Sequence, residues 1–350
     1  MAMPSLDIGI ACDLRSDFDS AQGVPVDALE EYDSRATVEA IAAALASLGH
    51  RPRRLGGGRR LIEALLAQPP QLVFNIAEGR GSRNREAQVP AVCEMLGVPC
   101  THSDPLTLAL ALDKAMSKQL LRAAGIRTAA FAVASSIEQA RRVDLPFPLF
   151  VKPVAEGSSM GVRVDSRVDD MPALLRQVER CLRDYRQPVL IECYLPGVEV
   201  TVGVCGADED ARVIGAMEIA PVRVGTGEFI YGLEAKRNYL EEVRYHAPPL
   251  TLDERQRADA EASALAACRA LGCRDIARVD LRFDAAGHAN LVEVNPIPGL
   301  NPVSSDLVIM NGLLGSSYQA LIGLILDAAL KRLSVAEICA TASRQALTWP

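Results

Sequence analysis

The sequence predicts an α/β protein whose first part is a parallel α/β domain, followed by strands that pair in antiparallel fashion. Residues 6–12 and 71–76 are short apolar runs typical of buried strands, and residues 36–48 and 86–96 have the apolar content and length of helices. Alternation of strand and helix is the pattern of a parallel sheet. Glu78, in the loop after the second strand, therefore lies where ligands bind such sheets, although an ordinary polar loop explains it equally well.

Further elements follow along the chain. One long helix is expected over residues 105–124, and an apolar helix over residues 316–333. Residues 222–245 mix glycine, charge and aromatic side chains without clear periodicity, which predicts a mobile loop. Strands are expected over residues 149–152, 189–191, 199–204, 276–283 and 290–294.

Composition and charge narrow the class of protein. The 350 residues suffice for two or three domains, and the net charge of −7 argues against a general nucleic-acid binder, because phosphate contacts need a basic surface. Nine scattered cysteines without a CxxC pair predict reduced thiols and a cytoplasmic location. The chain does not start with a basic segment followed by an apolar one, and its apolar stretches are interrupted, so neither a signal peptide nor a membrane span is expected.

The most informative motif lies late in the chain, in two strands joined by a turn at residues 284–287. Side chains alternate along a strand, so Arg278 and Asp280 share one face of the first strand, and Glu293 and Asn295 share one face of the second. In an antiparallel pair these faces can form one side of the sheet, where the carboxylates repel unless a cation lies between them. Mg²⁺ bound by few carboxylates together with substrate phosphates fits this arrangement.

A loop rich in glycine and serine, over residues 156–162, predicts a phosphate site. Its glycines let the backbone approach an anion, the hydroxyl of Ser158 adds a donor, and Lys152 ends the preceding strand. When the loop is considered without Lys152, an ordinary turn explains its glycines and serines. Lys114 and Lys118 share one face of an earlier helix, for which a solvated basic face is the simpler interpretation.

Another segment could hold a nucleotide base. Glu192, Tyr194 and Leu195 follow a strand, where backbone groups can meet the edge of an adenine, and the carboxylate of Glu199 can bind ribose hydroxyls. In isolation, two surface glutamates explain the same pattern.

Together these segments resemble the ATP-grasp superfamily, and within it the D-alanine–D-alanine ligase family. The agreement runs in order from about residue 86 to about residue 306. It comprises Leu112-Asp113-Lys114, Val151-Lys152-Pro153, residues 156–161, Ile191-Glu192 with Gly197 and Glu199, Glu234-Ala235-Lys236, residues 277–280, Glu293-Val294-Asn295 and Pro298-Gly299.

The resemblance implies an ATP-grasp fold with an N-terminal α/β substrate domain at residues 1–104. A central subdomain at residues 105–190 and a C-terminal subdomain at residues 191–350 would grip ATP between them, with a lid loop at about residues 222–245. Carried over by position, the ATP contacts are Lys114, Lys152, Glu192, Tyr194, Leu195 and Glu199, with Lys118 a weaker candidate.

The resemblance also implies the roles of the other site residues. Two Mg²⁺ ions, which Mn²⁺ could replace, would be bound by Asp280, Glu293 and Asn295. The catalytic candidates are Arg278 and the backbone N–H of Gly299 as the oxyanion pair, Lys236 of the lid loop, and Ser158. The substrate-binding candidates are Glu78, Ser304 and Ser305.

The implied reaction joins two small amino-acid substrates, with ATP converted to ADP. One carboxylate would attack the γ-phosphate to give an acyl phosphate, and the amine of the second substrate would attack the acyl carbon. The family also implies a homodimer. The alternative is a protein of the same fold that binds ATP as a sensor or regulator without turnover.

The N-terminal part departs from the family pattern. The family carries Gly-Gly-x-Ser-x-Glu after the first strand, and its glutamate binds the amine of the first substrate, whereas residues 11–16 here read Ala-Cys-Asp-Leu-Arg-Ser. Glu30, Glu31 and Asp33 come later and could substitute. Arg237 replaces a frequent tyrosine beside the lid lysine, and it is a candidate for recognising an additional carboxylate. These positions lie on the substrate side, so the substrate pair stays open.

Overall fold

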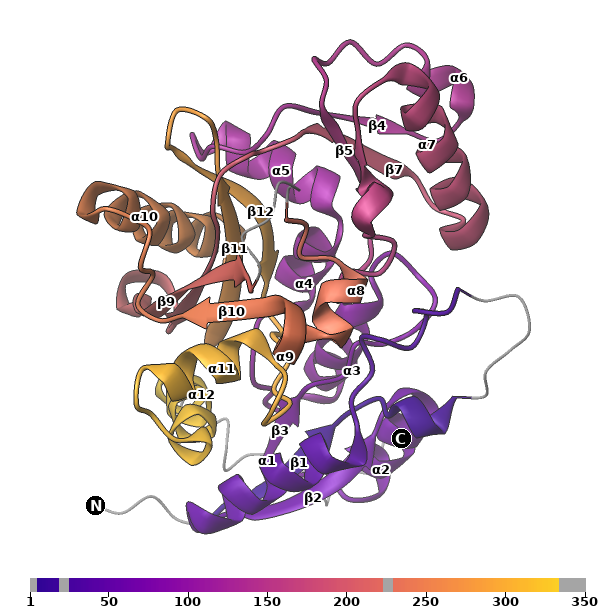
Figure 1. Cartoon of the computed structure of the whole chain (residues 1–350). Coiled ribbons are helices and arrows are strands. Elements are labelled where there is room, and N and C mark those ends of the chain that lie inside the picture. The colour runs from indigo at the N-terminus through magenta and orange to yellow at the C-terminus, as the bar shows by residue number, and fades with distance from the viewer. Residues whose placement is uncertain (1–4, 19–24, 223–228, 334–350) are drawn as a thin grey trace.

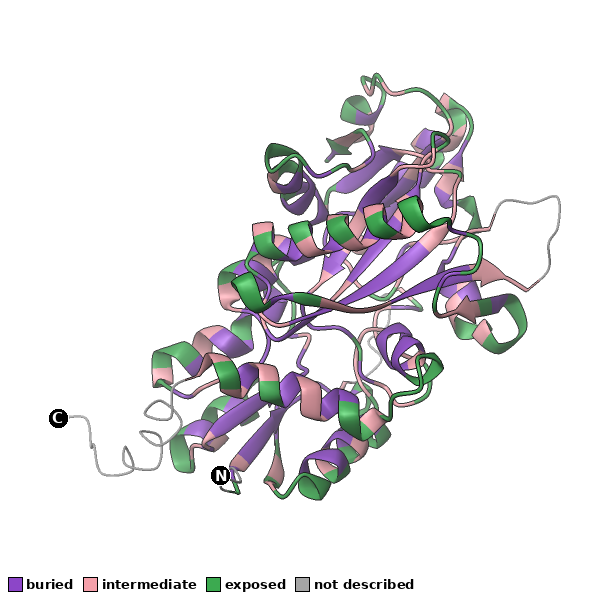
Figure 2. Cartoon of the chain, turned by 90° about the vertical axis from the view of Figure 1, so that its left-hand side faces the viewer, coloured by how far each residue is buried: buried purple, intermediate pink, exposed green. Residues whose placement is uncertain are grey.

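Three β-sheets with their flanking helices follow one another across the molecule (Figure 1). The structure is a computed structural model, and it describes residues 5–18, 25–222 and 229–333. Buried strands lie between helices that turn exposed faces outward, as Figure 2 shows. This layering confirms the predicted α/β class. The domain bounds at residues 104 and 190 stay a prediction, and strand β7 spans the second of them.

The first sheet is parallel, with strand order β2-β1-β3, as the alternation of strand and helix predicts. The sequence did not predict strand β2, because it is a charged edge strand with few apolar residues, Arg-Pro-Arg-Arg-Leu-Gly. The strands of the first sheet are β1 (Asp7–Ala11), β2 (Arg51–Gly56) and β3 (Leu72–Asn75). Its helices are α1 (Arg35–Ser47), α2 (Gly58–Ala67) and α3 (Gln88–Leu96), with short 3₁₀ turns at Arg15–Asp17 and Arg85–Ala87.

The single helix predicted over residues 105–124 is wrong, because the chain forms two helices there. Helix α4 spans Pro105–Leu112 and helix α5 spans Lys114–Ala123. Asp113 separates them: its backbone is extended, and its carboxylate accepts hydrogen bonds from the N–H groups of Ala115 and Met116. An aspartate that caps a new helix ends the previous one, and it places Lys114 in the first turn of α5.

The second sheet is antiparallel, with strand order β4-β7-β5-β6, and it stands at the top of Figure 1. Helix α7 packs Leu174, Val178 and Cys181 against Leu149 and Val151 of this sheet. The strands are β4 (Phe131–Ala134), β5 (Leu149–Pro153), β6 (Arg167–Val168) and β7 (Val189–Cys193). The helices are α6 (Ile137–Ala140) and α7 (Met171–Tyr185), with 3₁₀ turns at Val164–Ser166 and, further on, Asp208–Asp210.

The third sheet is antiparallel, with strand order β10-β9-β8-β11-β12, and it carries most of the site. Helix α10 contributes Ala260, Ala264 and Ala267 to the apolar core on one face. Helices α11 and α12 pack on the other face, in a core that continues into the first sheet. The strands are β8 (Glu199–Cys205), β9 (Arg212–Pro221), β10 (Val243–His246), β11 (Ile276–Phe283) and β12 (Ala289–Asn295). The helices are α10 (Glu254–Leu271), α11 (Asp306–Leu313) and α12 (Tyr318–Arg332).

The predicted loop over residues 222–245 contains regular structure. Helix α8 spans Leu233–Arg237, helix α9 spans Tyr239–Glu242, and strand β10 pairs with β9. The elements are too short for a periodic signal to emerge from the sequence. Residues 223–228 of this predicted loop lie outside the described residues.

Two further expectations concern membranes and cysteines. Within the described ranges no single helix is long and apolar enough to cross a membrane, and α11 with α12 meets the limits only as a pair bent by 112°. The eight cysteines of the described residues are all free thiols.

Two neighbouring cations on α12 allow a matched test of what buried charge contributes to stability. Arg332 contacts both carboxylate oxygens of the buried Asp275 at 3.0 and 2.9 Å, and the His102 N–H adds a hydrogen bond of 2.7 Å. We expect Asp275→Asn to lower the free energy of unfolding by about 2 kcal/mol, because charged hydrogen bonds in the interior are lost. Urea unfolding measures the change.

Asp210→Asn is the control, because its partner Lys331 lies 2.8 Å away in an exposed pair. Loss of this exposed ion pair should lower the free energy of unfolding by less than about 1 kcal/mol. Equal losses for the two variants would contradict the importance assigned to the buried pair.

Candidate active site

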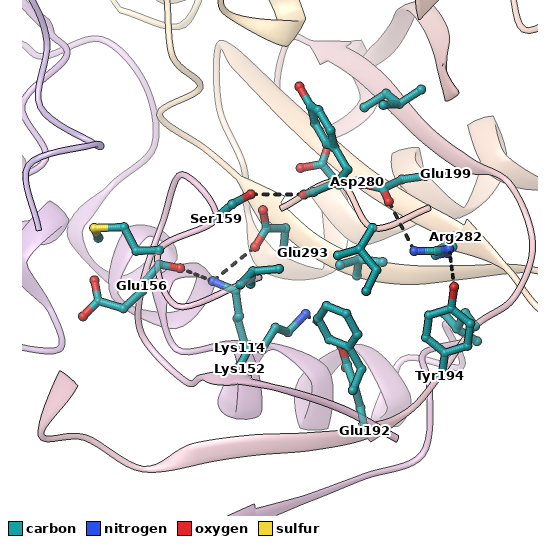
Figure 3. A pocket seen from close by; sticks show the side chains of 18 of the residues that line it. Lys114, Lys152, Glu156, Ser159, Glu192, Tyr194, Glu199, Asp280, Arg282 and Glu293 are labelled. Carbon is teal, nitrogen blue, oxygen red and sulfur yellow. Dashed lines mark hydrogen bonds and ion pairs between the residues drawn. The ribbon is translucent and has the colours of Figure 1, made fainter. Parts of the chain in front are cut away.

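Two adjoining cavities lie where the three sheets meet, and every site residue predicted from the sequence except the weaker candidate Lys118 lines one of them. The second cavity encloses about 460 Å³, enough for a small-molecule substrate. The first is lined by Lys152, Glu192, Tyr194, Leu195, Glu199 and Asp280 (Figure 3). The second is lined by Glu78, Ser158, Arg278, Asn295, Gly299, Ser304 and Ser305. Lys114, Lys236 and Glu293 line both.

The register of β11 and β12 builds the wall shared by the cavities. Asp280 lies directly opposite Glu293, and Arg278 lies opposite Asn295, as the predicted antiparallel pairing requires. The Arg278 guanidinium donates to Asp280 at 2.8 to 3.1 Å, and the Asn295 amide donates to it at 3.1 Å. Burial alone lowers the pKa of Arg278, but Asp280 and the neighbouring carboxylates raise it overall, so the guanidinium stays a fixed cation.

Lysines from the central part of the chain reach this wall. Lys114 Nζ lies 3.1 Å from a carboxylate oxygen of Glu293 and also donates to the Glu156 carbonyl (Figure 3). Although burial raises the pKa of Glu293, Lys114 and other cations lower it overall. Lys152 Nζ lies 2.8 Å from Glu192. Glu293 and the Nζ atoms of two lysines that pair with carboxylates therefore line the first cavity.

Lys118, the weaker candidate, does not line either cavity. Its side chain is almost completely buried, and its Nζ contacts Glu192 at 3.0 Å, Thr128 at 2.6 Å and the Leu291 carbonyl at 3.1 Å. Burial lowers the pKa of Lys118. The Lys118 side chain is thus part of the structure that holds Glu192, and the interpretation as a solvated basic face is wrong.

Arg282 is a site residue that the sequence reasoning missed. It donates to the Tyr194 hydroxyl at 2.8 Å and to the Phe229 carbonyl at 3.0 Å, and it lies 3.6 Å from Glu199. Burial raises the pKa of Glu199 to about 7, against the lowering effect of Arg282. The alternation of β11 gives the missed signal, because Arg282 is two residues beyond Asp280 and belongs to the same face.

The predicted phosphate loop has a left-handed backbone at its two serines, with φ of 48° at Ser158 and 58° at Ser159. Ser158 lines the second cavity. However, the Gly161 N–H does not point to a free anion site, because it donates to the carboxylate of Asp27 at 3.1 Å. The Tyr185 hydroxyl donates to the same carboxylate at 2.7 Å. The far end of the loop is therefore docked on the N-terminal part of the chain.

The loop between β12 and α11 forms the floor of the second cavity. A Cβ at Gly299 would lie 2.9 Å from the Ser305 hydroxyl oxygen, so the backbone approaches closely there. That hydroxyl accepts a hydrogen bond from the Asn301 N–H at 2.9 Å, which makes Ser305 a support of the loop. Ser304 is exposed beside the first turn of α11.

Helix α8 brings the lid residues to the cavity mouth. Lys236 lines both cavities, and its Nζ lies 5.0 Å from the ring centre of Tyr231. Arg237 donates to Glu30 at 2.5 and 3.1 Å and to the Val26 carbonyl at 3.2 Å. The arginine proposed to recognise an additional carboxylate therefore holds a carboxylate of the protein's own acidic cluster. That pair ties the lid to the N-terminal part.

Asp280, Glu293 and Asn295 are the residues that could hold a metal ion. Two carboxylates and one amide suit Mg²⁺, which retains water and phosphate ligands. No three or more His, Cys, Asp or Glu side chains converge into a metal cluster within the ranges that the structure describes. The protein thus offers a partial ligand set that phosphate oxygens would complete.

The pairing of Glu192 with two buried lysines predicts an acid-sensitive stability. Burial raises the pKa of Glu192, but Lys118 and Lys152 outweigh burial and lower it to about 2, from 4.5. The contribution to stability is complete above pH 4.5 and is lost as the pH falls towards about 2. We expect Glu192→Gln to cost about 3 kcal/mol at neutral pH, because two buried cations lose their counter-charge.

Denaturant unfolding of both proteins across this pH range measures the difference, which should shrink below pH 4.5. Glu209→Gln, at an exposed position, is the control. A difference that stays constant down to the lowest pH would show that Glu192 does not titrate as described.

Comparison with known proteins agrees with this geometry. The family described as "D-ala D-ala ligase C-terminus" matches residues 120–327. A D-alanine–D-alanine ligase of Caulobacter sp. is 36% identical over 79% of this chain and 82% of its own. An uncharacterized protein of Sinorhizobium fredii is 35% identical over 84% of this chain and 87% of its own. The D-alanine–D-alanine ligase of Bacillus anthracis complexed with ATP has a TM-score of 0.67 at 20% identity, over 94% of this chain and 98% of its own. The chain belongs to the D-alanine–D-alanine ligase family and has its ATP-grasp fold.

Proposed function

We propose that this protein is an ATP-dependent ligase that joins the carboxylate of one amino acid to the amine of another, with release of ADP and phosphate. One observation carries the proposal: Arg278, Asp280, Glu293 and Asn295 form a charged wall between two cavities. One cavity is lined by paired lysines and the other is large enough for amino acids. Family membership supports the same reaction.

ATP would occupy the first cavity, and its phosphates would reach the wall. Lys152 and Lys114 are placed to contact phosphate oxygens, since both line the first cavity and each is held there by an ion pair with a carboxylate. The segment containing Tyr194 and Leu195 would meet the adenine, and Glu199 would meet the ribose. Arg282 orients Tyr194 and Glu199 through its hydrogen bond and ion pair.

Asp280, Glu293 and Asn295 fit Mg²⁺ by donor chemistry, as few hard oxygen ligands beside a phosphate site. When bound, the metal would neutralise charge that develops on the transferred phosphoryl group. The protein keeps Glu293 deprotonated for this role through Lys114 and the neighbouring cations.

The chemical steps follow from the second cavity. A carboxylate oxygen of the first amino acid attacks the γ-phosphorus, and the bond to the ADP oxygen breaks, giving ADP and an acyl phosphate. The amine of the second amino acid then attacks the acyl carbon, the bond to the phosphate oxygen breaks, and the amine loses a proton. Arg278 and the Gly299 N–H line the cavity where the oxyanion of this second step would form.

A screen of D- and L-amino acid pairs tests the reaction itself. We expect release of ADP and phosphate with at least one pair, and a product whose mass equals the two amino acids less one water. ATP binding without turnover for any pair would support the sensor alternative.

The role of Arg278 has its own test in Arg278→Lys, which keeps the charge but loses the planar fork. We expect kcat to fall by about 10²-fold or more, because an oxyanion donor is lost. The Kd for ATP, measured by calorimetry, should change little, since Arg278 lines only the second cavity. Near-normal kcat would contradict the assignment.

A further inference from the structure

Two carboxylates of the second cavity have no hydrogen-bond or ion-pair partner among the residues that the structure describes. Glu78 and Glu86 both line this cavity, and neither makes a hydrogen bond or an ion pair with any residue in the described parts of the chain. Glu86 is only 9% exposed, so the residue is nine-tenths buried at the cavity wall. Every other buried glutamate discussed above has a lysine or arginine beside it, and the sequence reasoning named only Glu78.

Three nearby cations are already engaged. Arg85 donates to both oxygens of Glu31 at 3.0 and 2.6 Å and to the Ala155 carbonyl at 2.9 Å. Lys114 is bound to Glu293, and Arg278 is bound to Asp280. These three cations are therefore bound to other carboxylates, whereas Lys236, which lines the same cavity, forms no ion pair among the described residues.

An unpaired buried carboxylate is costly, which makes a cationic ligand the natural complement. Burial raises the pKa of Glu86 to about 7, and burial and the neighbouring glutamates raise the pKa of Glu78 well above its ordinary value. Both groups would regain their charge when a cation enters.

The two glutamates differ in their distance from the reaction centre. Glu86 lies close enough to Lys114 and Glu293 for both to affect its titration. Glu78 interacts most strongly with Glu86 itself, and then with Glu31, Arg85 and Asp33. Of the two, only Glu86 is named with Lys114 and Glu293 of the charged wall, so we assign it to the reacting end of a substrate and Glu78 to the far end.

We propose that the second cavity selects a diamino acid as the carboxylate-donating substrate, an inference that rests on the proposed ligase function. The carboxylate lies at Arg278 and Gly299, the α-ammonium contacts Glu86, and the side-chain ammonium contacts Glu78. A neutral amino acid would compensate only one of the two glutamates, because it carries a single ammonium group.

Matched substrates test this selection on the full-length enzyme with Mg²⁺ and ATP. 2,4-Diaminobutyrate is compared with norvaline, and ornithine with norleucine, each as D and L forms and paired with alanine as the amine donor. We expect kcat/KM, measured by ADP release, to be at least about tenfold higher for one diamino acid than for its neutral isostere, as for a lost charged contact. Equal or better turnover of the neutral isosteres overturns the inference and leaves the ligase function standing.

Glu78→Gln tests whether Glu78 is the residue that contacts the side-chain ammonium of the substrate. The ratio of kcat/KM between the diamino acid and its isostere should fall towards one, through KM. Glu94→Gln, on the exposed face of α3, is the control and should keep the ratio of the unmodified enzyme. An unchanged ratio in Glu78→Gln overturns the assignment.

Calorimetric binding of the same amino acids without ATP separates the two proposals. If no amino acid supports ADP release, the ligase function fails, and binding alone decides the selection. Tighter binding of the diamino acid that is lost in Glu78→Gln supports the inference, and equal binding of the neutral isostere overturns it.

Discussion

The ion pair between Lys114 and Glu293 is the contact on which the site depends. It joins the start of α5 to β12, and both residues line both cavities. Asp113 makes the contact possible, because it ends α4 and starts α5 just before the lysine. On the other side, the β11–β12 register places Asp280 opposite Glu293. A helix cap and a strand register, far apart in sequence, thus converge on one charged group.

Buried charge is expensive, and this protein compensates for most of it internally. Glu192 has Lys118 and Lys152, Glu293 has Lys114, and Asp280 has Arg278. Such pairs hold their charges in place before any ligand arrives, which suits a site for phosphoryl transfer because little reorganisation is needed. Glu78 and Glu86 depart from the rule within the described cavity walls, and that departure distinguishes the substrate side from the phosphate side.

Sequence reasoning succeeded where one local pattern specified the geometry. The alternation of side chains in β11 and β12 was enough to predict that Arg278, Asp280, Glu293 and Asn295 share one side of the sheet. It failed where tertiary context decides. The edge strand β2 carries little apolar signal, and the cap at Asp113 is invisible within an apolar helical run.

The ion-pair partners of buried side chains could not be predicted from the sequence for the same reason. Lys118 reads as a surface lysine, yet its partner Glu192 is more than seventy positions later. Glu86 is predicted to start a helix, and only the structure shows that it lines the second cavity without a partner among the described residues. The family resemblance is strongest for the residues that line the first cavity, because its motifs there are local, whereas the substrate side depends on loops that differ from the family pattern.

Isotope transfer tests the central claim most directly, namely that this charged wall promotes phosphorylation of a substrate carboxylate. The first amino acid is labelled with ¹⁸O in both carboxylate oxygens and incubated with Mg²⁺, ATP and the second amino acid. An acyl-phosphate route predicts that each released phosphate carries one ¹⁸O, detected by mass spectrometry, because the acyl C–O bond breaks in the second step. ADP formation with unlabelled phosphate would contradict the account.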